Sequence, residues 1–334
     1  MVQSKRRVGY IFMVMASVVI VLAGIKLAAV IVVPFLLSVF LAIILAPLFE
    51  WLKSLGLPDV LAIVMVMSVL VVLMSAITVL VGNSVQDFSS NLPLYEAKLI
   101  ENFNSIIVFL EAFGLELPND ELLQMFDPKT TVKYIAGTLK NFGSIVTKSL
   151  MIMLMVIFML LEISHFQKKF ISLDSESSEQ FSEISTKIKH YMLLKTVISM
   201  ATGIIVSLLL MIIGVDYYVL WGLVAFLFNF IPNIGSIIAA VPAVILALVQ
   251  FGPAMAVVVS AVYIAINIVV GSIIEPKVMG QGLGLSTLVV FLSLIFWGWL
   301  LGPVGMLLSI PLTIMVKIAL DAQQNTKWIA TLLA

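Results

Sequence analysis

The sequence predicts an all-α, polytopic membrane protein with about eight transmembrane spans and broken or re-entrant helical hairpins in its C-terminal part. Of the 334 residues, 62% are hydrophobic and 11% are charged, whereas an average soluble domain is about 45–50% apolar and about 25% charged. Several charge-free runs reach or exceed the roughly 20 residues with which a helix crosses a bilayer. A membrane β-barrel would instead show alternation within segments of about 10 residues.

The same composition limits the classes of function. A soluble enzyme and a disordered chain are both excluded, because the first needs a charged surface and the second needs low hydrophobicity. The 18 basic and 18 acidic residues balance, so no basic surface for nucleic acid is expected. The chain has no cysteine and two histidines, so we expect no disulfide, no metal site and no cofactor. The expected surrounding is the lipid bilayer.

The charge-free runs define the spans. They cover residues 8–25, 27–49, 60–86, 149–161, 196–215, 217–274 and 278–316. The first three runs predict an N-terminal three-span bundle, residues 1–86. Lys5, Arg6 and Arg7 precede the first run as in a signal peptide, but its 18 residues exceed the usual apolar core of about 7–15, so we expect it to be retained. The run 217–274 has 58 residues, enough for three passes, and the run 278–316 has 39, enough for two.

Two polar segments interrupt this pattern. Residues 87–148 are predicted to form an extracytoplasmic amphipathic helical segment, and residues 149–195 the fourth span and a cytoplasmic linker helix. Apolar side chains recur every three or four residues at Leu99, Phe103, Ile106, Leu110 and Phe113, and again at Val132, Ile135, Leu139, Phe142 and Val146. A seam this narrow favours packing against another helix, in the same or a neighbouring subunit, over lying on the lipid surface.

Lysine and arginine positions orient the chain. With the N-terminus inside, the cytoplasmic segments carry twelve of these residues, Lys195 among them, and the short outer segments carry one, Lys26. Cytoplasmic loops of membrane proteins are enriched in such residues. We therefore expect both termini, including the tail 321–334, to be cytoplasmic.

Glycine and proline, rather than charge, divide the C-terminal region, residues 196–320. The first break contains Pro232, Gly235 and Pro242, and the second contains Pro303, Gly305 and Pro311. The aromatic-rich segments beside them have 15 and 13 residues, too few to span a bilayer comfortably. Two short, Gly/Pro-interrupted segments in corresponding positions indicate the binding region of a transporter. Ordinary helix kinks without a site are the alternative.

Few polar side chains lie near the breaks. We expect the breaks to face each other near mid-membrane, with Asn229, Asn233 and Asn267 donating hydrogen bonds to a small polar solute. The alternative role for these amides is hydrogen bonding between helices. Glu275 lies at the end of a span beside Lys277, and we expect the two to hold a gate or to carry a coupled proton. An interfacial ion pair is the alternative.

Longer motifs run through the same segments. They are VPF (33–35), HYMLLKT (190–196), NFIPNIGS (229–236) with Pro242, EPKVMGQGLGLS (275–286) and LIFWGWLLGPVGMLLSIPLT (294–313). Together they resemble the autoinducer-2 exporter family of bacterial permeases, over essentially the whole chain. The resemblance implies export of the quorum-sensing signal autoinducer-2 across the bacterial inner membrane by a homo-oligomer, a pentamer, in which each protomer has its own pathway. Other branches of the family resemble sodium- or lithium-proton antiporters.

We therefore expect a secondary transporter for efflux of a small polar signal molecule, autoinducer-2, and not an enzyme. No Walker A motif is present, so the chain is not expected to use ATP. A sodium(lithium)/proton antiporter is the first alternative, although such a protein should have a buried pair of carboxylates and only Glu275 qualifies. A passive oligomeric channel is the other alternative, although it would not need undersized, broken segments.

Overall fold

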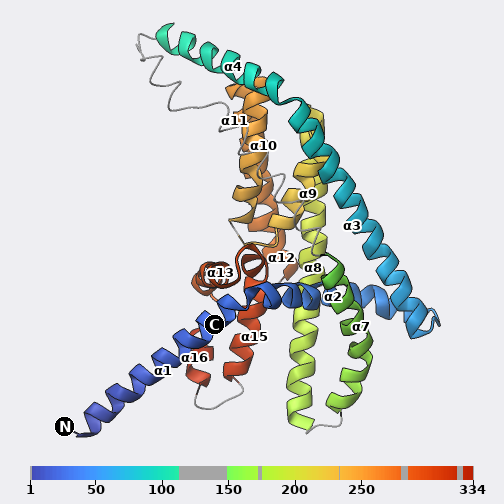
Figure 1. Cartoon of the computed structure of the whole chain (residues 1–334), viewed down its shortest axis with the longest axis vertical. Helices are drawn as coiled ribbons and strands as arrows, with labels where there is room; N and C mark the ends of the chain where they lie inside the picture. The colour runs from blue at the N-terminus through green and yellow to red at the C-terminus, as the bar shows by residue number, and fades with distance from the viewer. Residues whose placement is uncertain are drawn as a thin grey trace. The chain divides into compact units, whose positions relative to one another are not determined.

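The computed structural model of the chain describes residues 2–112, 149–171, 175–232, 234–279, 285–321 and 326–333. These residues form helices joined by short turns and contain no strand (Figure 1), which confirms the predicted all-α class. The helices in chain order are α1 (Val2–Leu27), α2 (Ala29–Ser54), α3 (Asp59–Ser90), α4 (Leu92–Ala112), α7 (Ser149–Ile171), α8 (Ser175–Ile213), α9 (Tyr218–Phe228), α10 (Gly235–Phe251), α11 (Pro253–Asn267), the π-helix η1 (Ile268–Ile274), α12 (Glu275–Met279), α13 (Thr287–Leu301), α14 (Pro303–Leu307), α15 (Ser309–Asp321) and α16 (Lys327–Leu332).

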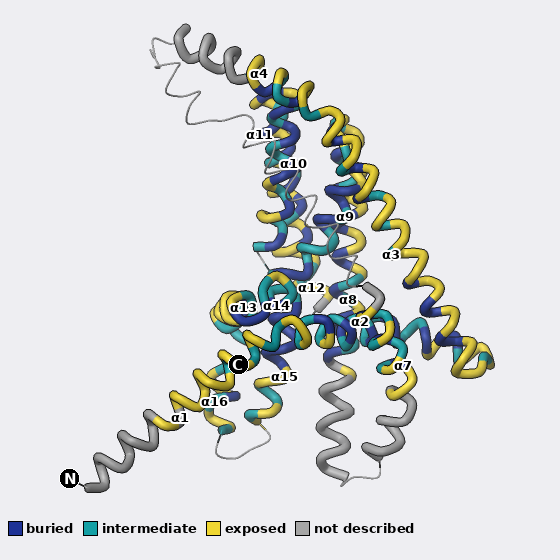
Figure 2. The backbone as a smooth tube through the Cα atoms, in the orientation of Figure 1, coloured by how far each residue is buried: buried dark blue, intermediate teal, exposed yellow. Residues whose placement is uncertain are grey.

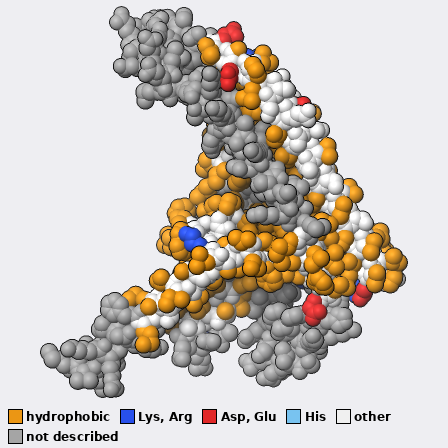
Figure 3. Space-filling view, in the orientation of Figure 1, with side chains coloured by type: hydrophobic (Ala, Val, Ile, Leu, Met, Phe, Trp, Pro, Cys, Tyr) orange, Lys and Arg blue, Asp and Glu red, His pale blue; other side chains and the backbone are white. Residues whose placement is uncertain are grey.

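Several of these helices are suited to a bilayer. Four stretches are long and apolar enough to cross it, namely Ala29–Ser54, Asp59–Ser90, Ile188–Ile213 and Pro253–Val278. Shorter apolar helices include Tyr218–Phe228, Gly235–Phe251 and Thr287–Leu301. Large apolar side chains are exposed along these helices (Figure 3), which is favourable in lipid and unfavourable in water. The chain is therefore a polytopic membrane protein, as predicted.

The chain divides into two compact units, each assembled from segments far apart in the sequence. The first unit contains Met1–Pro47, Met151–Ile188 and Leu283–Ala334, and the second contains Leu48–Leu150 and Lys189–Gly282. Both units draw on α2, α7 and α8, which cross the boundaries between them. The domain boundaries predicted at residues 86, 148, 195 and 320 stay predictions.

The core of the second unit lies where α9 and α10 pack with α8 and α11, and its buried side chains include Leu210, Trp221 and Leu246 (Figure 2). The helices α8 and α9 touch through their backbones. A Cβ atom added at Gly203 or at Gly222 would lie 2.6 Å from the carbonyl oxygen of the other glycine, so neither position has room for a side chain. Small residues let membrane helices approach this closely, and the contact holds the buried face of α8 beside α9.

Hydrogen bonds connect α4 to other parts of the second unit at two points. The Asn102 side-chain amide donates to the carbonyl oxygens of Leu248 and Val249, which lie 3.2 and 3.1 Å away near the end of α10. The Tyr95 hydroxyl donates to a carboxylate oxygen of Asp216 at 2.8 Å. Burial raises the pKa of Tyr95, so this hydroxyl keeps its proton and remains a donor.

The amphipathic helix predicted around residues 99–113 is present as α4, which ends at Ala112. Leu99, the first residue of the predicted seam, is buried in the core of the second unit. The remaining side chains of that seam and the whole of the second seam lie outside the part of the chain that the structure describes.

Candidate functional site

The first Pro-Gly break joins α9 to α10 through a tight reversal of the backbone. The backbone N–H of Asn229 donates to the carbonyl oxygen of Ala225 at 2.9 Å, and the backbone N–H of Ile231 donates to the carbonyl oxygen of Phe228 at 2.8 Å. Gly235 then begins α10 against the same Phe228 carbonyl, because an added Cβ atom would lie 1.8 Å from its oxygen. Only glycine tolerates so close an approach, and this contact fixes the place where the chain leaves α9.

The second break, between α13 and α14, uses the same device. Gly302 has a φ of 70°, a left-handed conformation that favours glycine, and Pro303 occupies the first turn of α14. A Cβ atom added at Gly305 would lie 2.0 Å from the carbonyl oxygen of Trp297. In each break, therefore, a glycine packs directly against a backbone carbonyl oxygen near the end of the preceding helix. The two breaks resemble each other in this local geometry as well as in sequence.

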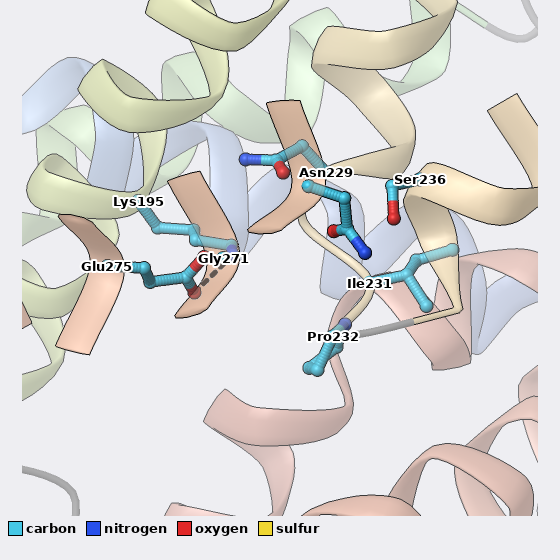
Figure 4. A pocket seen from close by; sticks show the side chains of 8 residues that line it. Lys195, Asn229, Ile231, Pro232, Ser236, Gly271 and Glu275 are labelled. Carbon is cyan, nitrogen blue, oxygen red and sulfur yellow. Dashed lines mark hydrogen bonds and ion pairs between the residues drawn. The ribbon is translucent and has the colours of Figure 1, made fainter. Parts of the chain in front are cut away.

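A polar cavity lies beside the first break, within the second unit (Figure 4). Its lining consists of Lys195 from α8, Asn229, Ile231 and Pro232 from the break, Ser236 from α10, and Asn267, Gly271 and Glu275 from the α11–η1–α12 stretch. Its volume is about 60 Å³, enough for a few water molecules, because roughly 10–15 Å³ holds one. Polar groups from three separate parts of the chain thus converge on one small space.

An ion pair closes one side of this cavity. The ammonium nitrogen of Lys195 lies 2.5 Å from a carboxylate oxygen of Glu275, and Figure 4 shows the two side chains directed toward each other. The Lys195 side chain is 2% exposed and that of Glu275 is 21% exposed. An isolated charge in so apolar a surrounding would be very costly, so each of the two groups needs the other as its counter-charge.

This pair changes the interpretation of two predicted residues. Glu275 does not form an interfacial ion pair with Lys277, because its carboxylate is occupied by Lys195 and the Lys277 side chain is exposed. Lys195, counted from the sequence among the cytoplasmic lysines, lies inside the membrane-crossing stretch Ile188–Ile213 of the continuous helix α8. The reason is that α8 runs on through residue 195 without a turn, and its buried face carries the lysine inward.

Two amide side chains, those of Asn229 and Asn267, line the same cavity as the ion pair. The Asn229 side chain donates to the Ser199 hydroxyl on α8 at 2.9 Å, which leaves its carbonyl oxygen as an acceptor. Asn267 is the last residue of α11 and is followed by the π-helix η1, a rare element that often occurs at functional sites. Its side-chain oxygen lies beside Gly271, since a Cβ atom added there would be 3.3 Å from it.

The structure thus brings together Asn229, Pro232, Asn267 and Glu275 of the predicted site residues, with Gly235 next to them. Asn233 lies outside the described residues. Pro303 and Gly305 belong to the first unit, and their meeting with the first break stays a prediction.

Sequence reasoning missed Lys195, Ser199 and Ser236. A usable signal was present on α8, where Lys195, Ser199, Thr202 and Gly203 place charged, polar and small residues at intervals of three and four in an otherwise apolar helix. Such residues share one face, and a polar face inside a membrane helix points toward protein or a cavity.

A polytopic helical membrane protein with a polar cavity beside a broken helix has the architecture of a membrane transporter. Residues 15–325 match the family described as AI-2E family transporter. The chain belongs to this family.

Similar proteins cover nearly the full length of the chain. It is 40% identical over 327 residues to the AI-2 transport protein TqsA of Escherichia coli strain K12, covering 97% of this chain and 95% of that protein. It is 42% identical over 327 residues to a putative transport protein of Haemophilus influenzae, covering 95% and 94%. It is 36% identical over 327 residues to the putative transport protein YhhT of Escherichia coli strain K12, covering 97% and 94%.

Proposed function

We propose that the chain is a secondary transporter that exports the small polar signal molecule autoinducer-2. The observation that carries this proposal is the polar cavity, whose lysine and glutamate are paired with each other. With those charges balanced, the other polar side chains of the lining are the amides of Asn229 and Asn267 and the hydroxyl of Ser236. Such groups suit a neutral ligand that donates and accepts hydrogen bonds. The relative named as an AI-2 transport protein supports autoinducer-2 as that ligand.

A sodium(lithium)/proton antiporter fits this cavity less well. A cation held in an apolar surrounding needs a negative partner. Glu275 is the one carboxylate among the described residues that line the cavity, and it is 2.5 Å from the ammonium group of Lys195. A sodium ion would have to compete with that lysine, whereas a neutral solute would not.

In the proposed mechanism, Asn229 and Asn267 hydrogen-bond to the solute while the backbone of the break supplies further acceptors. Glu275, with Lys195 as its partner and Lys277 two residues further on, holds the gate at the cytoplasmic mouth or carries a coupled proton. Asn233, Pro303 and Gly305 are kept in the proposed pathway on the strength of the sequence pattern.

We further propose that the protein lies in the bacterial inner membrane with both termini in the cytoplasm and that it assembles as a homo-oligomer, a pentamer. The distribution of lysine and arginine supports the orientation. The motif resemblance supports the membrane and the assembly.

The test is uptake into inverted membrane vesicles, in which an exporter concentrates its substrate in the lumen. We expect uptake of autoinducer-2 by the unmodified protein, no sodium-dependent proton exchange, and a loss of most uptake in Asn229→Leu and in Asn267→Leu. Asn83→Leu is the matched control, because Asn83 is an exposed amide on α3. Full uptake in both cavity variants would show that these amides are packing groups and that the site lies elsewhere.

A further inference from the structure

The helices α9 and α10 form a hairpin whose two ends are held together in different ways. At one end the chain is continuous through the break, where Gly235 packs against the Phe228 carbonyl oxygen. At the other end a hydrogen bond makes the connection, because the Gln250 side-chain oxygen near the end of α10 accepts from the backbone N–H of Asp216 at 3.1 Å. Such a bond can be exchanged for bonds to water at little net cost, so this end of the hairpin can separate while the break stays intact.

The turn between α8 and α9 is also held by α4. The Tyr95 hydroxyl donates to the Asp216 carboxylate at 2.8 Å and lies 3.3 Å from the Tyr217 hydroxyl. The Tyr95 ring stacks on the ring of Phe88 at the end of α3, with centroids 5.2 Å apart. Tyr95 is 2% exposed, whereas Asp216 is exposed. A buried side chain of α4 therefore holds a turn that water can reach.

The same turn has a strained backbone. Tyr217 has a φ of 59° and a ψ of 31°, and it is the one residue other than glycine with a positive φ in the part of the chain that the structure describes. A bulky residue keeps this left-handed conformation where the surrounding contacts enforce it. One such contact is the hydrogen bond from the Trp221 indole N–H to the Asp216 carbonyl oxygen at 3.0 Å. Strain of this kind is concentrated at sites that bind ligands or switch between conformations.

A transporter with this cavity has to change shape. The polar cavity has a volume of about 60 Å³, whereas sites for small organic molecules usually have about 300–1,000 Å³. At one side of it, the Lys195–Glu275 pair joins α8 to α12. Ile213, the last residue of α8, follows Lys195 by 18 residues, which is about 27 Å along the helix. The turn at Asp216 thus lies at the opposite end of α8, and polar contacts hold the second unit closed at both ends of this helix.

We propose that the Asp216–Tyr217 turn is a latch, which Tyr95 and Gln250 hold closed and whose release lets α9 separate from α10 at the end away from the Lys195–Glu275 pair. The break is the pivot of this motion, and the cavity then opens toward the latch. Relaxation of the Tyr217 backbone favours release and offsets part of the loss of hydrogen bonds. The latch goes beyond the proposed function, because it requires a cavity that enlarges and not a particular solute.

The first experiment removes one hydroxyl from the latch and follows access to the cavity. The chain has no cysteine, so Ser236→Cys places a single thiol in the cavity lining. An impermeant thiol reagent is applied from the side of the membrane on which a cysteine replacing Glu101 of α4 is labelled. Tyr95→Phe should raise the labelling rate at position 236 about two- to tenfold, the factor by which the loss of one hydrogen bond shifts an equilibrium.

The control for this substitution is Tyr218→Phe, which removes the hydroxyl of an exposed tyrosine directly after the turn and should leave the labelling rate unchanged. Thermal unfolding in detergent is measured on the same variants. An unchanged labelling rate in Tyr95→Phe, with or without a lower thermal midpoint, would make its hydroxyl a structural contact and overturn the latch. Equal increases in the two variants would also overturn it, because they would show a general loosening of the fold.

The second experiment tests whether Tyr95 acts through Asp216. Asp216→Ala removes the carboxylate but retains the backbone groups that bond to Gln250 and Trp221. The double variant Tyr95→Phe/Asp216→Ala should be labelled no faster than the faster of the two single variants, because both substitutions remove the same contact. Rate increases that multiply would show that the two side chains act independently and would reject the latch. Asp216→Asn, which keeps an acceptor for the Tyr95 hydroxyl, should be labelled more slowly than Asp216→Ala.

The outcomes also separate the latch from the proposed substrate. Faster labelling in Tyr95→Phe without any autoinducer-2 uptake by the unmodified protein would retain the latch and reject the substrate. Uptake of autoinducer-2 together with an unchanged labelling rate in Tyr95→Phe would retain the substrate and reject the latch.

Discussion

Neutralising Glu275 tests the ion pair at the cavity, and the structure predicts an asymmetry between its two partners. Glu275→Gln leaves Lys195, whose side chain is 2% exposed, as a buried charge without a counter-charge. Lys195→Met leaves Glu275, whose side chain is 21% exposed and borders the cavity, where water can still reach it. The glutamate variant should therefore be the less stable of the two.

The magnitudes follow from the burial. Breaking a buried pair from one side costs about 3–5 kcal/mol of unfolding free energy, and we expect Glu275→Gln to lie in this range. Partial hydration of the remaining carboxylate reduces the expected cost of Lys195→Met to about 1–3 kcal/mol. The double variant Lys195→Met/Glu275→Gln should lie within about 1 kcal/mol of the unmodified protein, because replacing a whole buried pair by groups of similar volume is often neutral. The resulting coupling energy is at least about 3 kcal/mol.

The assay is equilibrium unfolding in mixed detergent micelles, followed by export measurements on the same variants. The matched control is the exposed pair of Lys189 and Glu50, 3.2 Å apart with side chains 32% and 53% exposed. Its removal by Glu50→Gln should cost no more than about 1 kcal/mol. If the pair also gates transport, the double variant will be stable but inactive. Equal costs for Glu275→Gln and Glu50→Gln would refute the reasoning, because they would show that the cavity pair is as well solvated as a surface pair.

Three further predictions concern the breaks, the docking of α4 and the orientation in the membrane. Gly235→Ala should destabilise the protein by about 3 kcal/mol, since the added methyl group must displace the Phe228 carbonyl oxygen. Gly82→Ala is the control, because Gly82 has open space around it on α3, and it should stabilise the protein by about 0.5–1 kcal/mol. Equal effects of the two substitutions on thermal unfolding would argue against the close contact between Gly235 and Phe228. Asn102→Leu should lower stability by about 1–2 kcal/mol through the loss of two hydrogen bonds to the end of α10, and an unchanged unfolding midpoint would mean that α4 is held by apolar contacts alone. In intact cells an impermeant thiol reagent should label a single cysteine replacing Glu101 but not one replacing Ser175, and the reverse pattern would invert the topology.

Much of the architecture could be predicted because it depends on local chemistry. Glycine and proline close together favour an interruption of a helix, so the break at Pro232 and Gly235 follows from the sequence, as does the division of the 217–274 run into α9, α10 and the α11–η1 stretch. The site residues that follow from the same rule are those beside the break, such as Asn229.

The ion pair could not be predicted in the same way. Lys195 precedes an apolar run and therefore looks interfacial, and its burial depends on the helix continuing through it and on Glu275, 80 residues later, reaching the same face. The π-helix after Asn267 also has no local sequence signal, because it depends on how α11 packs. Tertiary contacts, rather than propensity, decide both features.

The π-helix η1 has a consequence for how this protein can change over evolutionary time. Across its seven residues the hydrogen bonds skip one residue more than in an α-helix, and the amide of Glu275 donates to the carbonyl oxygen of Val270, five residues earlier. A deletion of one residue within Ile268–Ile274 would let the helix return to regular α geometry. Because a π turn takes up about one residue more than an α turn, that deletion would leave Glu275 on nearly the same face as before, whereas a deletion within a regular α-helix would turn it by about 100°. The loss of one residue should therefore be tolerated better within η1 than within the regular α-helices beside it.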